Sequence, residues 1–587
     1  MDVTPQQDPE PRQPPEPSPY PPEPEGARDL PSHSTEPEGA RGLPPHLTEP
    51  EGATAVPPPP PTLRTTLRRA ALGTVAAAVL VAGAVVAVPD GDRNAGPKVP
   101  GPVERARAAA TAGSPASLSD LTALIGDRQK WVGEHPTDAP SWALLGTAYV
   151  EWGQRSADTA YYARAEEALK RSLEALAGER GNGEAWVGLA ALANARHDFV
   201  AAKRWGETVR AREPKTWSTY PVLIDAYNGL GDYKAAGRAT EKFGQLRKGV
   251  PALARTADMY RAQGWREDAL ATAREAADRA TTPAEKAASL HRLGDLAWER
   301  GEPEEAVAQY DAALHTDGGH HVSLVGRARA LTALGRTDEA LAAYQAVVQK
   351  LPSPEYVLEL GELYESLGLD GDARTQYAKL RTLLSRAKDA GVNESLLRAR
   401  YESDHGDADA AVELLRAEWS RQHRSAAVAD ALGWALHRSG RSQEGLEYAR
   451  RAVDTGIRNA SYAYHLGTIE RELAQYGSAR RHLEESLRTN PSFSPLAAPR
   501  AEEALADLGE PASGGPKDMR PEPKPSSAPS PEPEPEPEPA PTRAAPSKPS
   551  AAPSPAPSRA RQHSPEPQRP GAAGPPPASP AKPSASG

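Results

Sequence analysis

Apolar residues between positions 117 and 510 recur every three or four positions, the spacing that gathers them on one side of an α-helix. Glycine and proline interrupt this pattern at short intervals, so it predicts many short helices rather than one long one. All ten tryptophans lie between Trp131 and Trp434, so the large side chains needed for a core fall in the same region. The pattern therefore predicts an all-α fold for residues 117–510.

The helical pattern also repeats. A Leu-Gly pair occurs at positions 145, 293, 360, 432 and 466, and a small residue recurs from Ala202 to Ala479 at intervals of 33 to 37 residues. Self-similarity at such a period is typical of a solenoid of stacked helix pairs. A second glycine divides most units into two halves, because a left-handed residue can end a helix there at low steric cost. These dividing glycines are Gly231, Gly264, Gly301, Gly335, Gly368 and Gly440.

Gly294 interrupts a segment that otherwise predicts helix. A glycine inside a helix costs about 1 kcal/mol relative to alanine, so something must compensate for it. Twelve positions later the second helix of the same unit carries Ala306, another small residue. We expect the two small residues to face each other, so that the two helix backbones approach closely.

The motifs PSWALLGTAY (140–149) and YVLELGELYESLGLDGDARTQYAKL (356–380) resemble the tetratricopeptide repeat (TPR) family. Counted by phase, ten units run from about residue 139 to 492, although Ile224 and Arg398 replace the glycine in the third and eighth units. The resemblance implies a right-handed α-solenoid of about ten helix pairs with a concave groove. Residues 117–510 would then be the solenoid with its N- and C-terminal capping helices, the latter in PRAEEALADLGE (499–510).

Both ends of the chain differ in composition from the middle. Residues 1–63 are rich in Pro, Glu and Gly and contain a 13-residue tandem repeat that begins at Glu23, Glu36 and Glu49. Residues 511–587 consist largely of Pro, Ala, Ser and Glu. Such segments have too little apolar surface to offset the entropy of ordering, so we predict disordered termini and a linker at residues 91–116.

Residues 70–88 contain no charge over nineteen positions, close to the roughly 20 that span a bilayer as a helix. Arg64, Arg68 and Arg69 precede them, and Asp90 and Asp92 follow. By the positive-inside rule, residues 64–90 are predicted to be an uncleaved transmembrane signal anchor, with residues 1–63 cytoplasmic and the repeats extracytoplasmic. A signal cleaved near AGA (82–84) and a buried soluble helix are the alternatives. Heavy use of Ala, Arg, Gly and Pro indicates a GC-rich bacterial genome.

Charge and motifs exclude several classes of function. A net charge of −10 over 587 residues, without a long basic stripe, argues against nucleic acid as a partner. There is no cysteine, no phosphate-binding glycine loop, no HExxH and no GxSxG. We therefore predict no enzyme activity, no cofactor and no metal. His320 with His321, and Asp404 with Asp407 and Asp409, are interpreted as loop and turn residues.

In the TPR family the first helix of each unit lines the groove, so the resemblance implies a set of candidate groove residues. By phase they are Asp225, Asn228, Asp258, Arg261, His291, Asp295, Trp298, Arg329, Glu362, Glu365, Trp434, His437, Tyr464 and Arg471. Two patches, one around Trp298 and one around Trp434, would present the aromatic and Arg side chains that often anchor partners. The alternative is that each tryptophan packs between neighbouring first helices.

These features predict a membrane-anchored scaffold that binds a protein or peptide in an extracytoplasmic groove. Two alternatives stay open. EHPTDAPSWALLGTAYVEWG (134–153) resembles the repeat entry of bacterial cytochrome c maturation proteins, which implies an assembly or maturation chaperone. The Pro-rich arms and the solenoid are also compatible with a passive envelope spacer.

Overall fold

The computed structural model describes residues 99–176 and 182–509, and their regular structure is entirely helical. The predicted disordered termini and the predicted anchor at residues 64–90 lie outside these ranges. None of the described helices has the length and apolar character needed to cross a bilayer.

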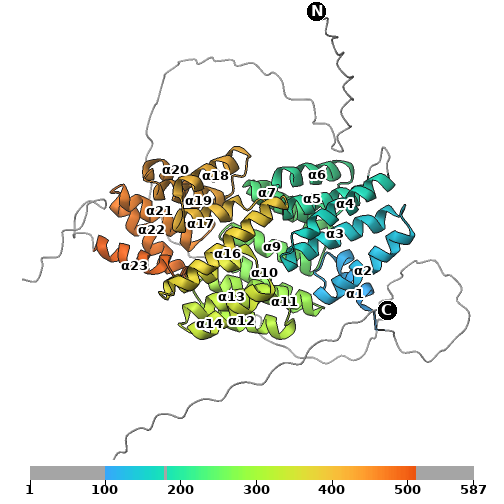
Figure 1. Cartoon of the computed structure of the whole chain (residues 1–587), viewed down its shortest axis with the longest axis horizontal. Coiled ribbons are helices and arrows are strands. Elements are labelled where there is room, and N and C mark those ends of the chain that lie inside the picture. The colour runs from blue at the N-terminus through green and yellow to red at the C-terminus, as the bar shows by residue number, and fades with distance from the viewer. Residues whose placement is uncertain (1–98, 177–181, 510–587) are drawn as a thin grey trace, which may run out of the picture. The chain divides into compact units, whose positions relative to one another are not determined.

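There are 23 described helices (Figure 1). The first twelve are α1 (Pro102–Ala112), α2 (Leu118–Glu134), α3 (Ala139–Ser156), α4 (Ala160–Ala175), α5 (Gly183–Ala195), α6 (Phe199–Arg212), α7 (Thr219–Leu230), α8 (Tyr233–Leu246), α9 (Val250–Ala262), α10 (Arg266–Arg279), α11 (Pro283–Glu299) and α12 (Pro303–Thr316). The others are α13 (His321–Ala333), α14 (Thr337–Lys350), α15 (Pro354–Ser366), α16 (Asp370–Asp389), α17 (Ser395–His405), α18 (Ala408–Ser420), α19 (Ala426–Arg438), α20 (Ser442–Val453), α21 (Ala460–Glu472), α22 (Tyr476–Thr489) and α23 (Ala497–Leu508).

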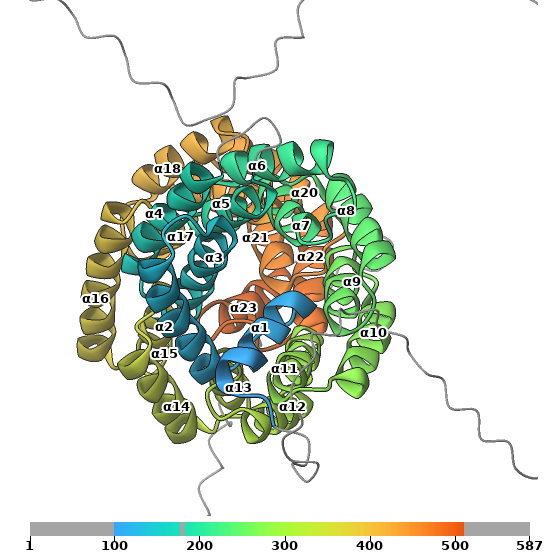
Figure 2. The same ribbon diagram turned by 90° about the vertical axis from the view of Figure 1, so that its right-hand side faces the viewer.

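Helices α3 to α22 form ten consecutive pairs, which confirms the predicted ten units, and α2 and α23 occupy the two predicted capping positions. The pairs wind into a superhelix. Figure 2 shows α6, α8, α10, α12, α14, α16 and α18 on its outside, with first helices such as α3, α7, α11 and α15 nearer the axis. The dividing glycines are left-handed as predicted, with φ between 69° and 79° from Gly231 to Gly440.

Gly294 packs against an aromatic ring. A Cβ atom on Gly294 would lie 2.5 Å from Cε1 of Tyr310, and one on Gly326 of α13 would lie 2.6 Å from the same atom. Tyr310 is completely buried between these two glycines, and its hydroxyl donates to Asp295. The prediction that Ala306 compensates for the glycine is thus corrected, because the nearest atoms belong to the larger side chain one helical turn later.

The same slot occurs in other units. Leu169 of α4 fills the space beside Gly146 and Gly188, and Tyr377 of α16 packs on Gly361. Small residues meet as expected in the ninth unit, where Gly433 faces the backbone of Gly445 and Ala449. In the tenth unit a Cβ on Gly467 would lie 3.1 Å from the carbonyl oxygen of Ala479 as well as 2.9 Å from the Leu483 side chain. In the first, fifth and seventh units a bulky residue on the second helix therefore fits against glycine on one or both neighbouring first helices.

The second turn of the superhelix packs directly on the first. The amide of Asn393 donates to the carbonyl of Arg196 at 3.0 Å. The amide of Ala426 donates to the hydroxyl of Tyr233, 193 residues earlier, at 2.8 Å. The side chain of Asn490 donates to the carbonyl of Trp298, 192 residues earlier, at 2.8 Å. These contacts join residues about 190 positions apart, and no single repeat could predict them.

The predicted linker at residues 91–116 contains helix α1, which corrects that assignment. Pro102 lies at its start and Gly113, with φ of 73°, ends it. Ala106 is buried, and Arg105 makes two hydrogen bonds to Asp120 of α2. The local signals for a helix were present, but the weak apolar pattern of this Ala-rich stretch concealed them.

We predict that Gly294→Leu lowers the free energy of unfolding by roughly 2–3 kcal/mol, because the added side chain would displace the Tyr310 ring. Gly126→Leu is the matched control, since Gly126 lies in α2 with no atom within 4 Å of its added Cβ. That control should be neutral or slightly stabilising. Urea unfolding of the two variants measures the difference. Equal stabilities of the two variants would contradict the close packing of Tyr310 against Gly294.

Candidate functional site

The inner surface of the superhelix carries a series of ion pairs between neighbouring first helices, which we call the inner ladder. Arg255 of α9 binds Asp225 of α7 at 2.5 and 3.1 Å. Arg292 of α11 binds Asp258 of α9 at 2.8 and 3.2 Å. The ladder continues with Arg261 to Glu299 at 2.8 Å and Arg329 to Glu359 at 2.6 and 2.8 Å. Each two-pronged contact fixes the spacing of successive units.

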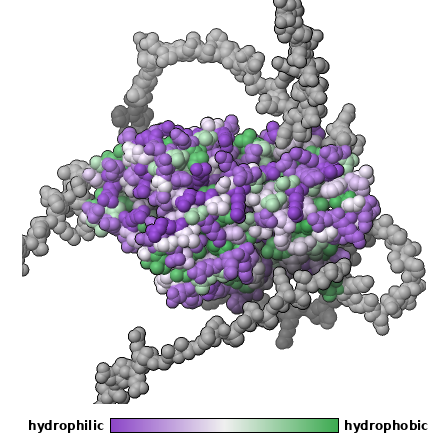
Figure 3. All heavy atoms as spheres, viewed as in Figure 1, coloured by the Kyte–Doolittle hydropathy of each residue, from purple (hydrophilic) through white to green (hydrophobic). Residues whose placement is uncertain are grey.

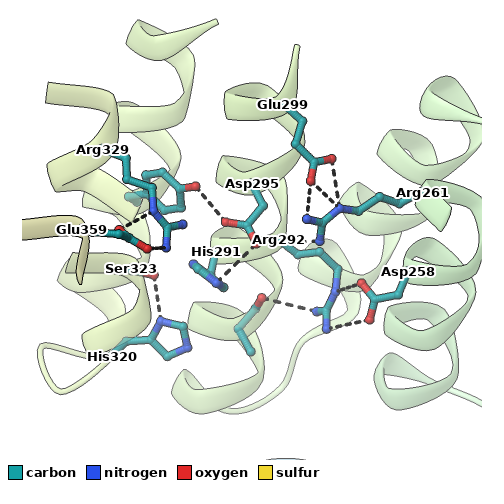
Figure 4. A network of polar contacts seen from close by, with 12 residues as sticks. Asp258, Arg261, His291, Arg292, Asp295, Glu299, His320, Ser323, Arg329 and Glu359 are labelled. Atoms are coloured by element: carbon teal, nitrogen blue, oxygen red, sulfur yellow. Dashed lines mark hydrogen bonds and ion pairs between the residues drawn. The ribbon is translucent and has the colours of Figure 1, made fainter. Parts of the chain in front are cut away.

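The ladder is densest between α9 and α15 (Figure 4). Asp295 lies at its centre and accepts a hydrogen bond from the Tyr310 hydroxyl at 2.8 Å. His291 Nε2 lies 3.5 Å and Arg261 Nη1 lies 3.9 Å from Asp295 Oδ2. The Tyr310 ring that fills the glycine slot therefore also positions a carboxylate on the inner surface. Tyr310 therefore contributes both to the packing between helices and to the polar contacts of the inner surface.

Burial and neighbouring charges set the ionisation of this cluster. Burial alone would raise the pKa of Asp295, but the nearby His291, Arg261 and Tyr310 more than offset it and the pKa is lowered. Burial lowers the pKa of His291, so its ring is neutral near pH 7 and Arg261 is the cation that remains. Burial alone would lower the pKa of Arg329, but the neighbouring Glu359 carboxylate outweighs the effect of burial, and the pKa is raised. Near neutral pH the cluster alternates fixed cations with carboxylates.

A second cluster joins α15, α16 and α17. His405 Nδ1 lies 3.1 Å from Glu365, and Nε2 lies 3.6 Å from Glu362. Tyr377 donates to Glu365 at 2.7 Å. Burial lowers the pKa of His405, but the two carboxylates outweigh it and the pKa is raised. Two predicted groove residues thus share a histidine that the sequence did not single out.

The predicted patch around Trp434 is assembled, but inside the wall. Trp434 and Tyr464 are only 6% and 5% exposed. Trp434 stacks on His465 with a centroid distance of 4.3 Å and donates to Asp404 at 2.9 Å. This is the alternative arrangement, in which a tryptophan packs between neighbouring first helices. These two residues are therefore corrected from groove anchors to packing residues.

The remaining candidates divide between the inner surface and the contact between turns. Arg471 pairs with Asp507 of α23 at 3.0 Å, and His437 lies 3.0 Å from the Ser442 hydroxyl. Trp298 is half-buried, and its carbonyl accepts the hydrogen bond from Asn490 of the second turn. Asn228 lines a cavity of about 460 Å³ between the turns. None of the fourteen candidates is fully exposed.

Sequence reasoning missed the partners that complete the ladder: Arg255, Arg292, Glu299, Glu359 and His405. A signal for two of them was present. Arg255 and Arg292 each lie three positions before a predicted acidic residue, Asp258 and Asp295, on the same helix face. Their partners lie on the first helix of the preceding unit, which spacing within one helix does not reveal.

The cavity between the turns has a smaller neighbour of about 360 Å³, and the two share His197, Glu355 and Glu394. Within residues 99–176 and 182–509, no group of three or more His, Asp or Glu side chains is arranged to hold a metal ion. His320, interpreted above as a loop residue, directly precedes α13, and its Nδ1 atom lies 2.7 Å from the Ser323 hydroxyl.

Two tetratricopeptide repeat family models match residues 254–321 and 297–360. These residues, which carry the densest part of the ladder, are therefore similar to tetratricopeptide repeats. No curated protein sequence matches the chain.

Several solved structures are similar to parts of the chain. A tetratricopeptide repeat protein of Parabacteroides merdae is 18% identical, covering 44% of this chain and 97% of its own, with a TM-score of 0.28. PilF of Pseudomonas aeruginosa is 18% identical; the match covers 35% of this chain and 90% of PilF, with a TM-score of 0.28. A thermophilic TPR protein of Thermus thermophilus is 23% identical; the match covers 32% of this chain and 98% of that protein, with a TM-score of 0.27.

We expect His320 to make stability depend on pH. Burial, with repulsion from His291, lowers its pKa from 6.5 to about 4, so the unfolded chain binds a proton at a pH where the folded chain does not. Stability is therefore retained above pH 6.5 and lost as the pH falls toward 4. Between pH 7.5 and 5 the loss should be on the order of 2 kcal/mol.

Urea unfolding at both pH values, in wild type and His320→Gln, measures this contribution. The variant should lose less stability than wild type over the same interval, because glutamine does not titrate. His135, whose side chain is exposed on α2's C-terminal end, supplies the control His135→Gln. Parallel pH dependences of wild type and His320→Gln would refute the assignment.

Proposed function

We propose that this chain is a non-enzymatic scaffold that binds a protein or peptide along the inner surface of its superhelix. Tetratricopeptide repeats suggest protein–protein interaction, and the inner ladder supports the choice of surface. Its ion pairs keep half-buried cations and carboxylates in alternation along the axis, held in place before any partner arrives. An extended segment with a complementary order of charges would find preorganised contacts there.

The proposal includes membrane anchoring through residues 70–88, with the repeats on the extracytoplasmic side. It is supported by the uncharged stretch and by Arg64, Arg68 and Arg69 before it. Anchoring would hold the scaffold near its partners at the membrane. The maturation-chaperone and spacer hypotheses stay open as alternatives.

Reversing one rung of the inner ladder tests the binding surface. Asp225→Arg with Arg255→Asp preserves an ion pair and the net charge but inverts the local order of charges. Glu275→Arg with Arg279→Glu is the matched control on the outer helix α10, where the two residues form an exposed pair. Partners are recovered by crosslinking in living cells and identified by mass spectrometry.

The inner reversal should reduce recovery of specific partners about tenfold, equivalent to about 1.4 kcal/mol of binding. The outer reversal should leave recovery at the wild-type level, and urea unfolding should show both variants folded. Equal recovery from both folded variants would rule out the inner surface as the binding site.

A reporter that is active only outside the cytoplasm tests the topology. Fused after Pro511 of the full chain, it should be active, whereas the same reporter fused before residue 64 should be silent. Membrane fractionation of both fusions shows whether the chain is inserted. An inserted chain with the opposite pattern of activity would overturn the proposed orientation.

A further inference from the structure

The second helices carry acidic residues at one edge of the superhelix and basic residues at the other. One edge, the acidic edge, contains the starts of the second helices, and the other, the basic edge, contains their ends. Acidic residues in the first turns include Glu267, Asp268, Glu304, Glu305, Asp338, Glu339, Asp370 and Asp372. Basic residues in the last turns include Arg210, Arg212, Arg279, Lys350, Arg386, Lys388, Arg450 and Arg451. Both preferences complement the helix dipole.

Within the chain, the acidic edge of the first turn packs on the basic edge of the second. Three dividing glycines form this contact: a Cβ on Gly231 would strike the carbonyl of Arg424, and one on Gly264 would strike that of Gly456. A Cβ on Gly301 would lie 2.8 Å from Cδ of Pro491. The two edges are therefore shaped to fit each other closely.

The corresponding edge of the second turn has no such cover among the described residues. Gly335, Gly368 and Gly440 have the same left-handed conformation, yet nothing described lies within 4 Å of their added Cβ atoms. Leu367 and Leu369 beside Gly368 are 39% and 42% exposed. Figure 3 shows one side of the molecule, and its surface is mostly hydrophilic. The acidic edge at residues 367–372 is thus apolar in part and unmatched.

The basic edge of the first turn is covered by the last residue of α1 and the four residues after it, 112–116, which we call the N-terminal cap. A Cβ on Gly113 would lie 2.7 Å from the Trp217 ring. Arg247 donates to the carbonyl of Ala112 at 3.1 Å, and Ser114 donates to Glu285 at 2.5 Å. A left-handed glycine thus meets this edge, just as Gly231 meets the edge of the second turn.

We propose that a second copy of this chain docks on the basic edge of the first turn when the N-terminal cap leaves it. The acidic edge at residues 367–372 of one copy would lie against Lys215, Trp217 and Lys248 of the other. The contact continues the stacking of turns already present within one chain, and Asp370 and Asp372 of one copy would face Lys215 and Lys248 of the other. Because it joins two different surfaces head to tail, it does not close and would generate filaments.

Cysteine crosslinking of the full chain tests this, since the chain has no cysteine of its own. One copy carries Leu369→Cys and the other Lys215→Cys, and the intermolecular disulfide is quantified after mixing. Gly113→Leu, added to the Lys215→Cys copy, displaces the cap without altering either edge. A full chain lacking residues 99–114 serves as a second cap-free variant. Glu275→Cys on the outer helix α10 replaces Lys215→Cys as the control.

Release of the cap should raise the yield of the disulfide between positions 369 and 215 about tenfold over that of the capped chain. The yield of the control disulfide between positions 369 and 275 should stay unchanged. Far-ultraviolet circular dichroism checks that the cap-free chains are folded. Crosslinking of both folded cap-free chains at the control level would overturn the proposal. So would preferential linkage of position 369 to position 369 of another copy, since that contact is symmetric.

Discussion

The fit of one bulky side chain into a slot made by glycines on neighbouring first helices supports the rest of the structure. Tyr310 between Gly294 and Gly326 is the clearest case, and Leu169 beside Gly146 and Gly188 repeats it. Interiors are packed to crystal-like density, so a slot of this shape leaves little freedom in the angle between units. Repetition of that angle produces the superhelix.

The same packing explains why the inner surface is polar and ordered at once. With the first helices held close, Arg and acidic side chains of adjacent units come within hydrogen-bond distance, as in the pairs of Arg292 with Asp258 and Arg329 with Glu359. Pairing reduces the cost of half-burying these charges. The inner surface consequently has a fixed charge pattern, which is the property that the proposed binding of an extended partner requires.

Winding also creates contacts between residues about 190 positions apart, such as Tyr233 with Ala426 and Trp298 with Asn490. Glycines at the ends of the first helices acquire a second purpose there. They end a helix, and in the first turn they also let the next turn approach. The acidic and basic edges follow from helix dipoles, but only a coil tight enough to stack its turns brings them together.

The sequence by itself determined the helices, their pairing, the ten units and the left-handed glycines, because these depend on spacings of a few residues that every unit repeats. It also placed Asp225, Asp258, Arg261, His291, Asp295 and Arg329 on the first helices near the axis. The partner of Gly294, the burial of Trp434 and Tyr464, helix α1 and the stacked turns were decided by tertiary structure alone. Small changes in the angle between units add up along the chain, so residues far apart meet only at one value of that angle, which no local pattern encodes.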